Sequence, residues 1–201
     1  MTFKVLADTE LMLRVREDDQ CAFEALYHRY HRRLTSFFYG MCSNTLQAEE
    51  LSHETFARIW HLRQRYEATG SFTAYLFSCA RNIWLERCRE VRKQRRLGTV
   101  ETLDEAAFEL RTRKSFGPDS AANRAEVYAN VREALDELPE EQRMVFVMRI
   151  VEGFSLEEIA RIMQCPVNTV RSRKLLAVRK LRDALKNVFY PENSERLRYT
   201  S

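Results

Sequence analysis

Basic and hydrogen-bonding side chains are concentrated between Phe154 and Leu185, and their types suit contact with nucleic acid. Arg is the side chain most often used to read guanine, and Ser or Asn can hydrogen-bond to bases or phosphates. At about 100° per residue, one helical face collects the side chains that we expect to meet DNA: Asn168, Arg171, Ser172, Leu175, Leu176 and Arg179. The opposite face carries an apolar stripe of Val170, Ala177, Leu181, Ala184, Leu185 and Val188.

Two helices joined by a short turn must position these side chains. Ser155 precedes Glu158 by three residues, the capping-box spacing that starts a helix. Gln164 and Cys165 then break the pattern, and Pro166 suits the start of a second helix. The order predicts a helix-turn-helix over residues 156–175, whose second helix enters a DNA major groove. A merely solvated basic helix is the alternative, but it does not explain why the cap, the turn and the basic helix occur in that order.

An earlier segment, Phe72 to about Arg95, interleaves aromatic and basic residues: Tyr75, Arg81, Asn82, Trp84 and Arg87, followed by further arginines. Aromatic rings stack on unpaired bases and cations follow the phosphates of single-stranded DNA. The alternative places Tyr75 and Trp84 in the core and leaves the arginines solvated. From the sequence alone, stacking on bases and packing in the core are equally good interpretations for Tyr75 and Trp84.

Acidic residues share one face of a helix expected from Thr45 to Arg63, where Glu49, Glu50, His53 and Glu54 lie close together. Such a face suits a basic protein partner, although a solvated face is the simpler interpretation. His28 and His31 have no third ligand at suitable spacing, so we expect no metal site. Phosphate-loop, GxSxG and HExxH motifs are absent, and we expect neither enzyme activity nor a cofactor.

Composition favours an all-α protein, because the 201 residues include only 5 Gly and 4 Pro and no segment alternates cleanly. The net charge of +4 is small, so its distribution is more informative than its sum. The 5 cysteines form no CxxC pair, which predicts buried reduced thiols. No apolar run approaches the roughly 20 residues of a membrane span, and no signal-peptide core is evident. We therefore expect a cytoplasmic protein without membrane insertion.

The hydrophobic pattern divides the chain into two small helical domains joined by a flexible linker. The first covers residues 8–96, with helices expected over 10–17, 20–39, 45–63 and 72–95. The linker covers 97–123, with a possible short helix over 101–110. The second domain covers 124–187, and residues 188–201 form a tail. In the second domain, residues 144–151 are apolar nearly all round and are expected to be buried, and Gly153 should follow as a left-handed cap.

Three segments, taken in order, resemble RNA polymerase sigma factors of the extracytoplasmic-function group. AEELSHETFARIW (Ala48–Trp60) resembles the part of sigma region 2 that binds core polymerase. SFTAYLFSCARN (Ser71–Asn82) resembles the parts that melt and read the −10 element. The segment from Leu138 to Arg173 resembles sigma region 4, which reads the −35 element.

The resemblance implies a promoter-specificity subunit that does no chemistry itself, with core RNA polymerase and promoter DNA as partners and, commonly in the family, an anti-sigma factor. It implies core binding by Glu49, Glu50, His53, Glu54 and Phe56. It implies −10 binding by Tyr75, Arg81, Asn82, Trp84 and Arg87, with a flipped base held by the loop of residues 63–70. It implies −35 binding by Asn168, Thr169, Arg171, Ser172, Arg173 and Arg179.

Several positions depart from the family pattern, which often has Asp at Glu50, Gln at His53 and Trp at Tyr75. The family has an apolar residue at Lys174 and small polar or basic residues at Leu175 and Leu176. We therefore predict a −35 preference unlike the commonest one. The alternatives are a stand-alone helix-turn-helix regulator, which does not need the acidic helix face, and a protein-interaction module, which does not explain the basic helix.

Overall fold

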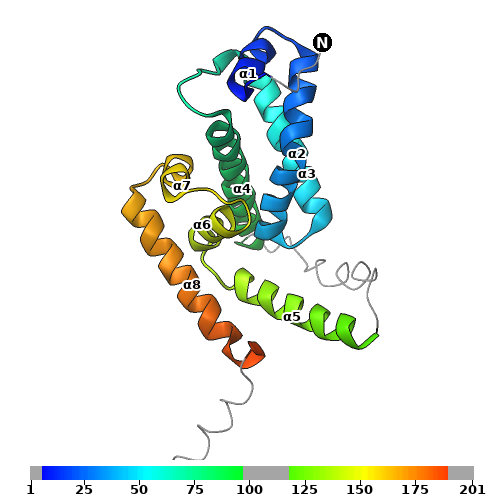
Figure 1. Cartoon of the computed structure of the whole chain (residues 1–201), viewed down its shortest axis with the longest axis vertical. Coiled ribbons are helices and arrows are strands. Elements are labelled where there is room, and N and C mark those ends of the chain that lie inside the picture. The colour runs from blue at the N-terminus through cyan, green and yellow to red at the C-terminus, as the bar shows by residue number, and fades with distance from the viewer. Residues whose placement is uncertain (1–5, 97–117, 190–201) are drawn as a thin grey trace, which may run out of the picture.

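The computed structural model describes residues 6–96 and 118–189, with side chains at 6–96 and 127–186, and over these ranges it is helical without strands (Figure 1). The N-terminal domain contains α1 (Asp8–Arg16), α2 (Gln20–Cys42), α3 (Thr45–His61), the short 3-10 helix η2 (Arg63–Arg65) and α4 (Phe72–Arg96). The C-terminal domain contains α5 (Pro118–Asp136), α6 (Glu140–Ile150), α7 (Leu156–Met163) and α8 (Val167–Phe189). The prediction of an all-α fold is confirmed.

Side-chain caps fix where the helices of the N-terminal domain begin. Asp19 accepts a hydrogen bond from the Ala22 amide at 3.0 Å, and Asn44 accepts one from the Gln47 amide at 3.0 Å. The apolar faces of α2, α3 and α4 then meet in one core, where Leu34, Phe37 and Phe77 have no exposed surface. This packing fixes the direction of α3 and α4, which carry the predicted binding residues.

The helix-turn-helix of the C-terminal domain forms as the sequence predicts. The Glu158 amide donates to Ser155 Oγ at 3.1 Å, and the Ser155 amide donates to the Glu158 carboxylate at 2.8 Å. The hydrogen bond that the Ser155 amide donates to the ionised carboxylate lowers the pKa of Glu158. Gln164 ends α7 in a left-handed conformation with φ 52°, and the Cys165 amide donates to the Ala160 carbonyl at 3.1 Å. The turn between α7 and α8 is therefore short, and backbone hydrogen bonds tie it to the end of α7.

Several helix boundaries differ from those expected. Helix α2 continues through Gly40 to Cys42 because Met41 is fully buried, and Ser43 then ends it at φ 55°. Helix α3 ends at His61. Helix α5 begins at Pro118, inside the segment assigned to the linker, because proline suits the first helical position. The possible helix over residues 101–110 and the tail from residue 190 lie outside the described residues.

The expected burial was wrong at a few positions. Helix α6 ends at Ile150, before the turn at Gly153 (φ 74°), so Ile150 and Val151 extend past the packed part of the helix and are 58% and 51% exposed. Ala184, expected in the apolar stripe of α8, is exposed. Cys21, in the first turn of α2, is an exposed free thiol, whereas the other cysteines are half-buried and free.

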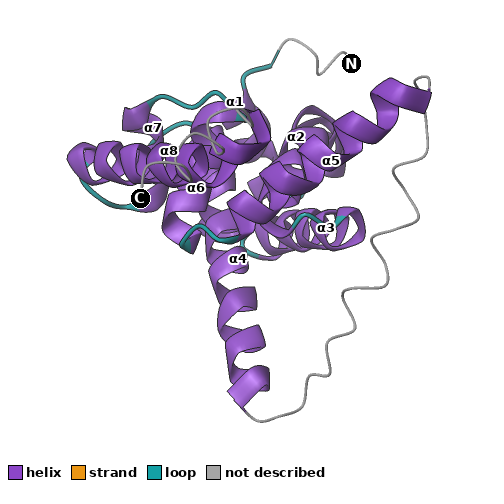
Figure 2. Cartoon of the chain, turned by 90° about the horizontal axis from the view of Figure 1, so that it is seen from below, coloured by secondary structure: helices purple, strands orange, loops and turns teal. Residues whose placement is uncertain are grey.

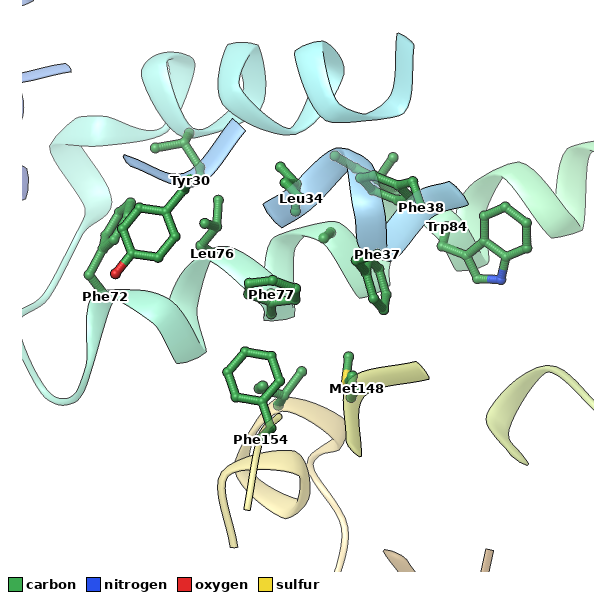
Figure 3. Close-up of a cluster of buried hydrophobic side chains, with 14 of the residues drawn as sticks. Tyr30, Leu34, Phe37, Phe38, Phe72, Leu76, Phe77, Trp84, Met148 and Phe154 are labelled. Carbon is green, nitrogen blue, oxygen red and sulfur yellow. The ribbon is translucent and has the colours of Figure 1, made fainter. Parts of the chain in front are cut away.

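The two domains are packed against each other, with α7 on α4 and α6 on α2. Figure 3 shows Met148 and Phe154 of the C-terminal domain facing Phe37 and Phe77 of the N-terminal domain. One continuous core therefore crosses the domain boundary. A second, smaller core holds α5 to α8 through Ala134, Leu138, Ala177 and Leu181, beside an apolar groove of about 310 Å³.

Candidate functional site

The reading face of α8, defined by Asn168, Arg171, Ser172, Leu175, Leu176 and Arg179, is exposed along its whole length. Val170 and Ala177 on the opposite side are fully buried, which fixes the rotation of the helix. Leu175 and Leu176 are 63% and 47% exposed, an unusual placement for large apolar side chains that nothing in the domain covers. Arg171 Nη1 donates to Asn168 Oδ1 at 3.5 Å within the same face. The face is therefore open to a duplex.

Thr169, Arg173 and Lys174 lie at the edge of the reading face and are half-buried. Arg173 donates to the carboxylate of Glu141 on α6 and to Cys165 Sγ at 3.4 Å. Because these contacts join α8 to α6 and to the preceding turn, Arg173 holds the recognition helix in place. A phosphate or base contact by Arg173 has to compete with Glu141.

The −10 residues predicted on α4 do not share one exposed face. Asn82 and Arg87 are exposed, and Arg81 is half-buried with Nη1 donating to Asn82 Oδ1 at 3.3 Å. Tyr75 packs against Tyr66 with ring centroids 5.0 Å apart, and burial raises its pKa above the usual range. Its ring is half-buried, so part of it remains accessible to a base.

Trp84 is only 8% exposed and belongs to the core. Its Nε1 is buried and has no hydrogen-bond partner among the described residues. The placement favours the core alternative over a stacking platform, because a base would have to displace packed side chains to reach the ring. The basic part of α4 lies further along, where Arg89, Arg92, Lys93, Arg95 and Arg96 are exposed on a helix end that extends away from the other helices (Figure 2).

The acidic face of α3, defined by Glu49, Glu50, His53 and Glu54, is exposed as expected. It borders a cleft of about 210 Å³ between α3 and α4, to which α4 adds Glu86 and Glu90. Arg58 crosses the cleft, with its Nη2 3.0 Å from Glu54 and its Nη1 2.7 Å from Glu86. This contribution of α4 was not predicted, although Glu86 and Glu90 lie one helical turn apart in the sequence, a spacing that indicates a shared face.

Phe56 is 3% exposed, with its ring 4.9 Å from that of Tyr27 and 6.1 Å from that of Phe23. Phe56 therefore packs α3 against α2 and presents almost no surface to a partner. His53 instead extends the acidic face toward α2, since its Nε2 lies 3.1 Å from the Tyr27 hydroxyl.

His31 is half-buried and stacks on His53 with ring centroids 5.3 Å apart. Burial lowers the pKa of His31, and the neighbouring His53 lowers it further. Among the described residues, no cluster of His, Cys, Asp or Glu has the arrangement of a metal site. No helix within residues 6–96 and 118–189 is long and apolar enough to cross a membrane.

The loop after α3 is anchored at one end and exposed at the other. Tyr66 is 3% exposed, and Gln64 Nε2 donates to the Arg16 carbonyl at 2.7 Å. The Arg63 guanidinium lies 4.4 Å over the Trp60 ring and forms an ion pair with Asp18. Residues 67–70 are exposed. The anchored half can hold the shape of the loop while the exposed half contacts a ligand.

Comparison with known proteins gives matches over both domains. Residues 26–96 match the family described as "Sigma-70 region 2", and residues 128–181 match "Sigma-70, region 4". The RNA polymerase sigma-H factor of Pseudomonas aeruginosa is 27% identical over 92% of this chain and 94% of its own length. The ECF RNA polymerase sigma factor SigX of Bacillus subtilis is 30% identical over 82% of this chain and 85% of its own.

A solved structure shares the fold. It is that of the sigma factor RpoE in complex with the anti-sigma factor NepR from Bartonella quintana, which matches with a TM-score of 0.64 at 24% identity. The match covers 82% of this chain and 96% of that chain.

Proposed function

The chain belongs to the extracytoplasmic-function group of RNA polymerase sigma factors, and from that premise we propose which of its surfaces bind core polymerase and which read each promoter element. As a sigma factor it binds core RNA polymerase and directs promoter-specific initiation, and it is not an enzyme. We assign core binding and promoter recognition to particular side chains, and we place the protein in the cytoplasm, where the polymerase acts.

The −35 element is read by the exposed face of α8. The single observation that carries this assignment is the exposure of Asn168, Arg171, Ser172 and Arg179 on one side while Val170 and Ala177 are buried on the other. This geometry lets the N-terminal part of the helix enter a major groove. Thr169 lies near the N-terminal end of α8, which enters the groove. Arg173 lies at the edge of the reading face and orients the helix through its contact with Glu141.

Leu175 and Leu176 extend the reading face with apolar surface. Apolar side chains in the major groove discriminate thymine by its methyl group. This part of the face therefore favours thymine-containing steps, which supports a −35 preference unlike the commonest one.

The −10 element is bound by α4 and the loop of residues 63–70. Tyr75 offers a half-buried ring for stacking, Asn82 offers an exposed amide, and Arg81 and Arg87 offer cations. Trp84 supports the helix from within, since it is 8% exposed.

Core polymerase is bound by the acidic face of α3 and the adjoining cleft. Glu50, His53 and Glu54 are exposed there, and Glu86 and Glu90 of α4 add negative charge across the cleft. Complementary charge of this kind speeds association and fixes the orientation of a basic partner. Phe56 positions α3 and makes no direct contact.

An anti-sigma factor is a further proposed partner. The support is that the structurally similar sigma factor from Bartonella quintana is in complex with one.

Run-off transcription with sigma-free core polymerase tests the proposal. Genomic promoter fragments are transcribed with and without the protein, with Arg171→Ala as a variant expected to choose promoters less selectively and Glu54→Ala as one expected to bind core polymerase more weakly. Discrete new transcripts whose upstream sequences share two elements support the assignment. If there are no transcripts and the protein does not co-elute with core, a stand-alone regulator is the better description.

A further inference from the structure

Helix α1 carries none of the side chains assigned above to DNA or to core polymerase, yet it lies beside the loop of residues 63–70 (Figure 1). At its N-terminal end, Asp8 accepts hydrogen bonds from the Tyr30 hydroxyl and from Arg29 Nη1, the latter at 2.7 Å. Its inner face is packed into the core, where three of its side chains have no exposed surface: Leu11, Met12 and Val15. The helix is therefore a fixed support for the neighbouring loop.

The turn after α1 presents a carboxylate to this loop. Asp18 has φ 66°, in the left-handed region that Asp and Asn enter more readily than other residues with a side chain. Its amide donates to the Val15 carbonyl at 3.0 Å, and the next residue, Asp19, begins α2 by accepting from the Ala22 amide at 3.0 Å. Asp18 is therefore held between two helices, and its carboxylate forms an ion pair with Arg63.

Two further contacts join α1 to the loop. Gln64 Nε2 donates to the carbonyl of Arg16, the last residue of the helix, at 2.7 Å. Tyr66 is 3% exposed. Burial raises the pKa of Tyr66, and a hydrogen bond with the side chain of Thr9, in the first turn of α1, opposes part of that rise. Because the contacts reach from Thr9 to Arg16, the loop lies along the helix rather than touching it at one point.

Tyr66 also connects the loop to α4. Its ring centroid lies 5.0 Å from that of Tyr75, with the two planes at 68°, and Tyr75 is the ring proposed above to stack on a −10 base. Residues 67–70 follow directly and are exposed. The exposed half of the loop therefore starts from a side chain that α1 holds on one side and α4 holds on the other.

We propose that α1 and the turn after it position the loop of residues 63–70 for a −10 base, with Asp18 as a positioning residue that determines how selectively this base is chosen. The inference rests on the proposed function, in which this loop and α4 bind the −10 element. A preorganised loop loses less conformational entropy on binding, whereas a loose one adapts to several ligands. Arg63 released from Asp18 is a cation that any phosphate attracts, so the effect is on selectivity rather than on total affinity.

Substitutions at position 18 separate the carboxylate from the backbone. Asp18→Gly removes the side chain, and glycine adopts the left-handed conformation without steric cost. Asp18→Asn keeps an oxygen that accepts a hydrogen bond from Arg63, and asparagine also tolerates this conformation. Glu17→Ala is the matched control, because Glu17 is an exposed carboxylate one residue away. The midpoint of urea unfolding should stay close to the wild-type value for all three variants.

Selection by the full chain bound to core polymerase measures selectivity. The probe is fork-junction DNA with the −35 duplex of a transcribed promoter and a randomised single-stranded −10 region, and the bound fraction is sequenced. Asp18→Gly should lower the preference for the best base at one −10 position by up to about fivefold, the most that loss of an exposed ion pair gives. Asp18→Asn and Glu17→Ala should stay within about twofold of wild type. Preference in a randomised −35 duplex should be the same for all.

A second variant tests the other attachment of the loop. Thr9→Val keeps the shape of the side chain and removes the hydroxyl that bonds to Tyr66, so Thr9→Val/Asp18→Gly should be less selective than Asp18→Gly. Wild-type selectivity in both Asp18→Gly and the double variant overturns the proposal. An equal loss at every −10 and −35 position also overturns it, because that result indicates a role in stability alone. A wild type without preference at any −10 position would instead contradict the proposed function of the loop.

Discussion

Arg173 on the recognition helix α8 donates to the carboxylate of Glu141 on α6, whereas Arg171, two residues earlier, donates to Asn168 of its own helix. The side chain of Arg173 is 22% exposed, while Arg171 belongs to the exposed reading face. The two arginines therefore differ in what they do. Arg173 joins α8 to α6, and we propose that Arg171 reads a base.

Arg171→Ala is expected to cost roughly 1–3 kcal/mol in discrimination between −35 duplexes that differ at one base pair. Arg173→Ala should instead lower affinity for all duplexes alike and reduce the free energy of unfolding. Fluorescence anisotropy with a set of single-base variants measures the first effect, and urea unfolding measures the second. A uniform loss for Arg171→Ala would make it a phosphate contact.

Leu175 and Leu176 should shift the preferred −35 sequence toward thymine-containing steps, because their exposed side chains can contact methyl groups. Selection from a pool of randomised promoters measures the preference. Leu176→Arg should move the selected sequence toward guanine at one position. Recovery of the common AAC-containing element by the wild type would show that these leucines do not determine the sequence.

Glu54→Ala should weaken binding to core polymerase by up to roughly 1 kcal/mol, the range for an exposed ion pair, and more strongly at low salt. Affinity for a −35 duplex should stay the same, since α3 lies outside the C-terminal domain. Glu17→Ala is the matched control, an exposed carboxylate on the same domain but away from the acidic face. Equal effects of the two substitutions on core binding would argue against the assignment of α3.

Trp84→Ala should reduce the free energy of unfolding by about 3–5 kcal/mol, the usual cost of truncating a buried tryptophan. Trp84→Phe should cost less, because among the described side chains the indole Nε1 has no partner that its removal would leave unpaired. Chemical denaturation of both variants measures these costs. A Trp84→Ala protein of full stability that no longer binds single-stranded −10 DNA would show instead that the ring stacks on a base.

Glu152 should make stability depend on pH. Burial raises the pKa of its carboxyl above the ordinary value, and hydrogen bonds from Arg33 and Ser36 oppose this only in part. The native protein thus holds this proton more tightly than the unfolded chain. The contribution of the group is therefore most favourable below the ordinary pKa and is lost as the pH rises through the raised value.

Glu152→Gln, which resembles the protonated form, should accordingly gain stability relative to wild type between pH 4.5 and pH 7. Urea unfolding at several pH values measures the difference, with Glu137→Gln as the control for an exposed carboxylate. A difference that does not change with pH would mean that the native and unfolded states bind the Glu152 proton equally.

Local periodicity was enough to predict the reading face of α8, because a 100° step fixes which side chains point opposite Val170. The caps at Asn44 and Ser155 were equally predictable, since each depends on residues only three positions apart. The burial of Trp84 and Phe56 was not predictable from the sequence. An aromatic residue beside the apolar stripe of a helix can belong to the core or to a binding surface, and only the positions of the neighbouring helices decide which.

Contacts between residues far apart in the sequence could not be predicted either, because they also depend on how the helices pack. Arg33 and Glu152 are 119 positions apart, and no local pattern marks either residue as the other's partner. The exposure of Ile150 and Val151 depends on where α6 leaves its neighbours, which a continuous apolar run does not reveal.

The covalent connection between the domains changes how strong their contact needs to be. Because the two domains belong to one chain, each meets the other at an effective concentration on the order of millimolar. A contact with a dissociation constant in that range already keeps the two domains together in half of the molecules. The individually small contacts between α2 and α6 and between α4 and α7 therefore suffice to hold the domains side by side.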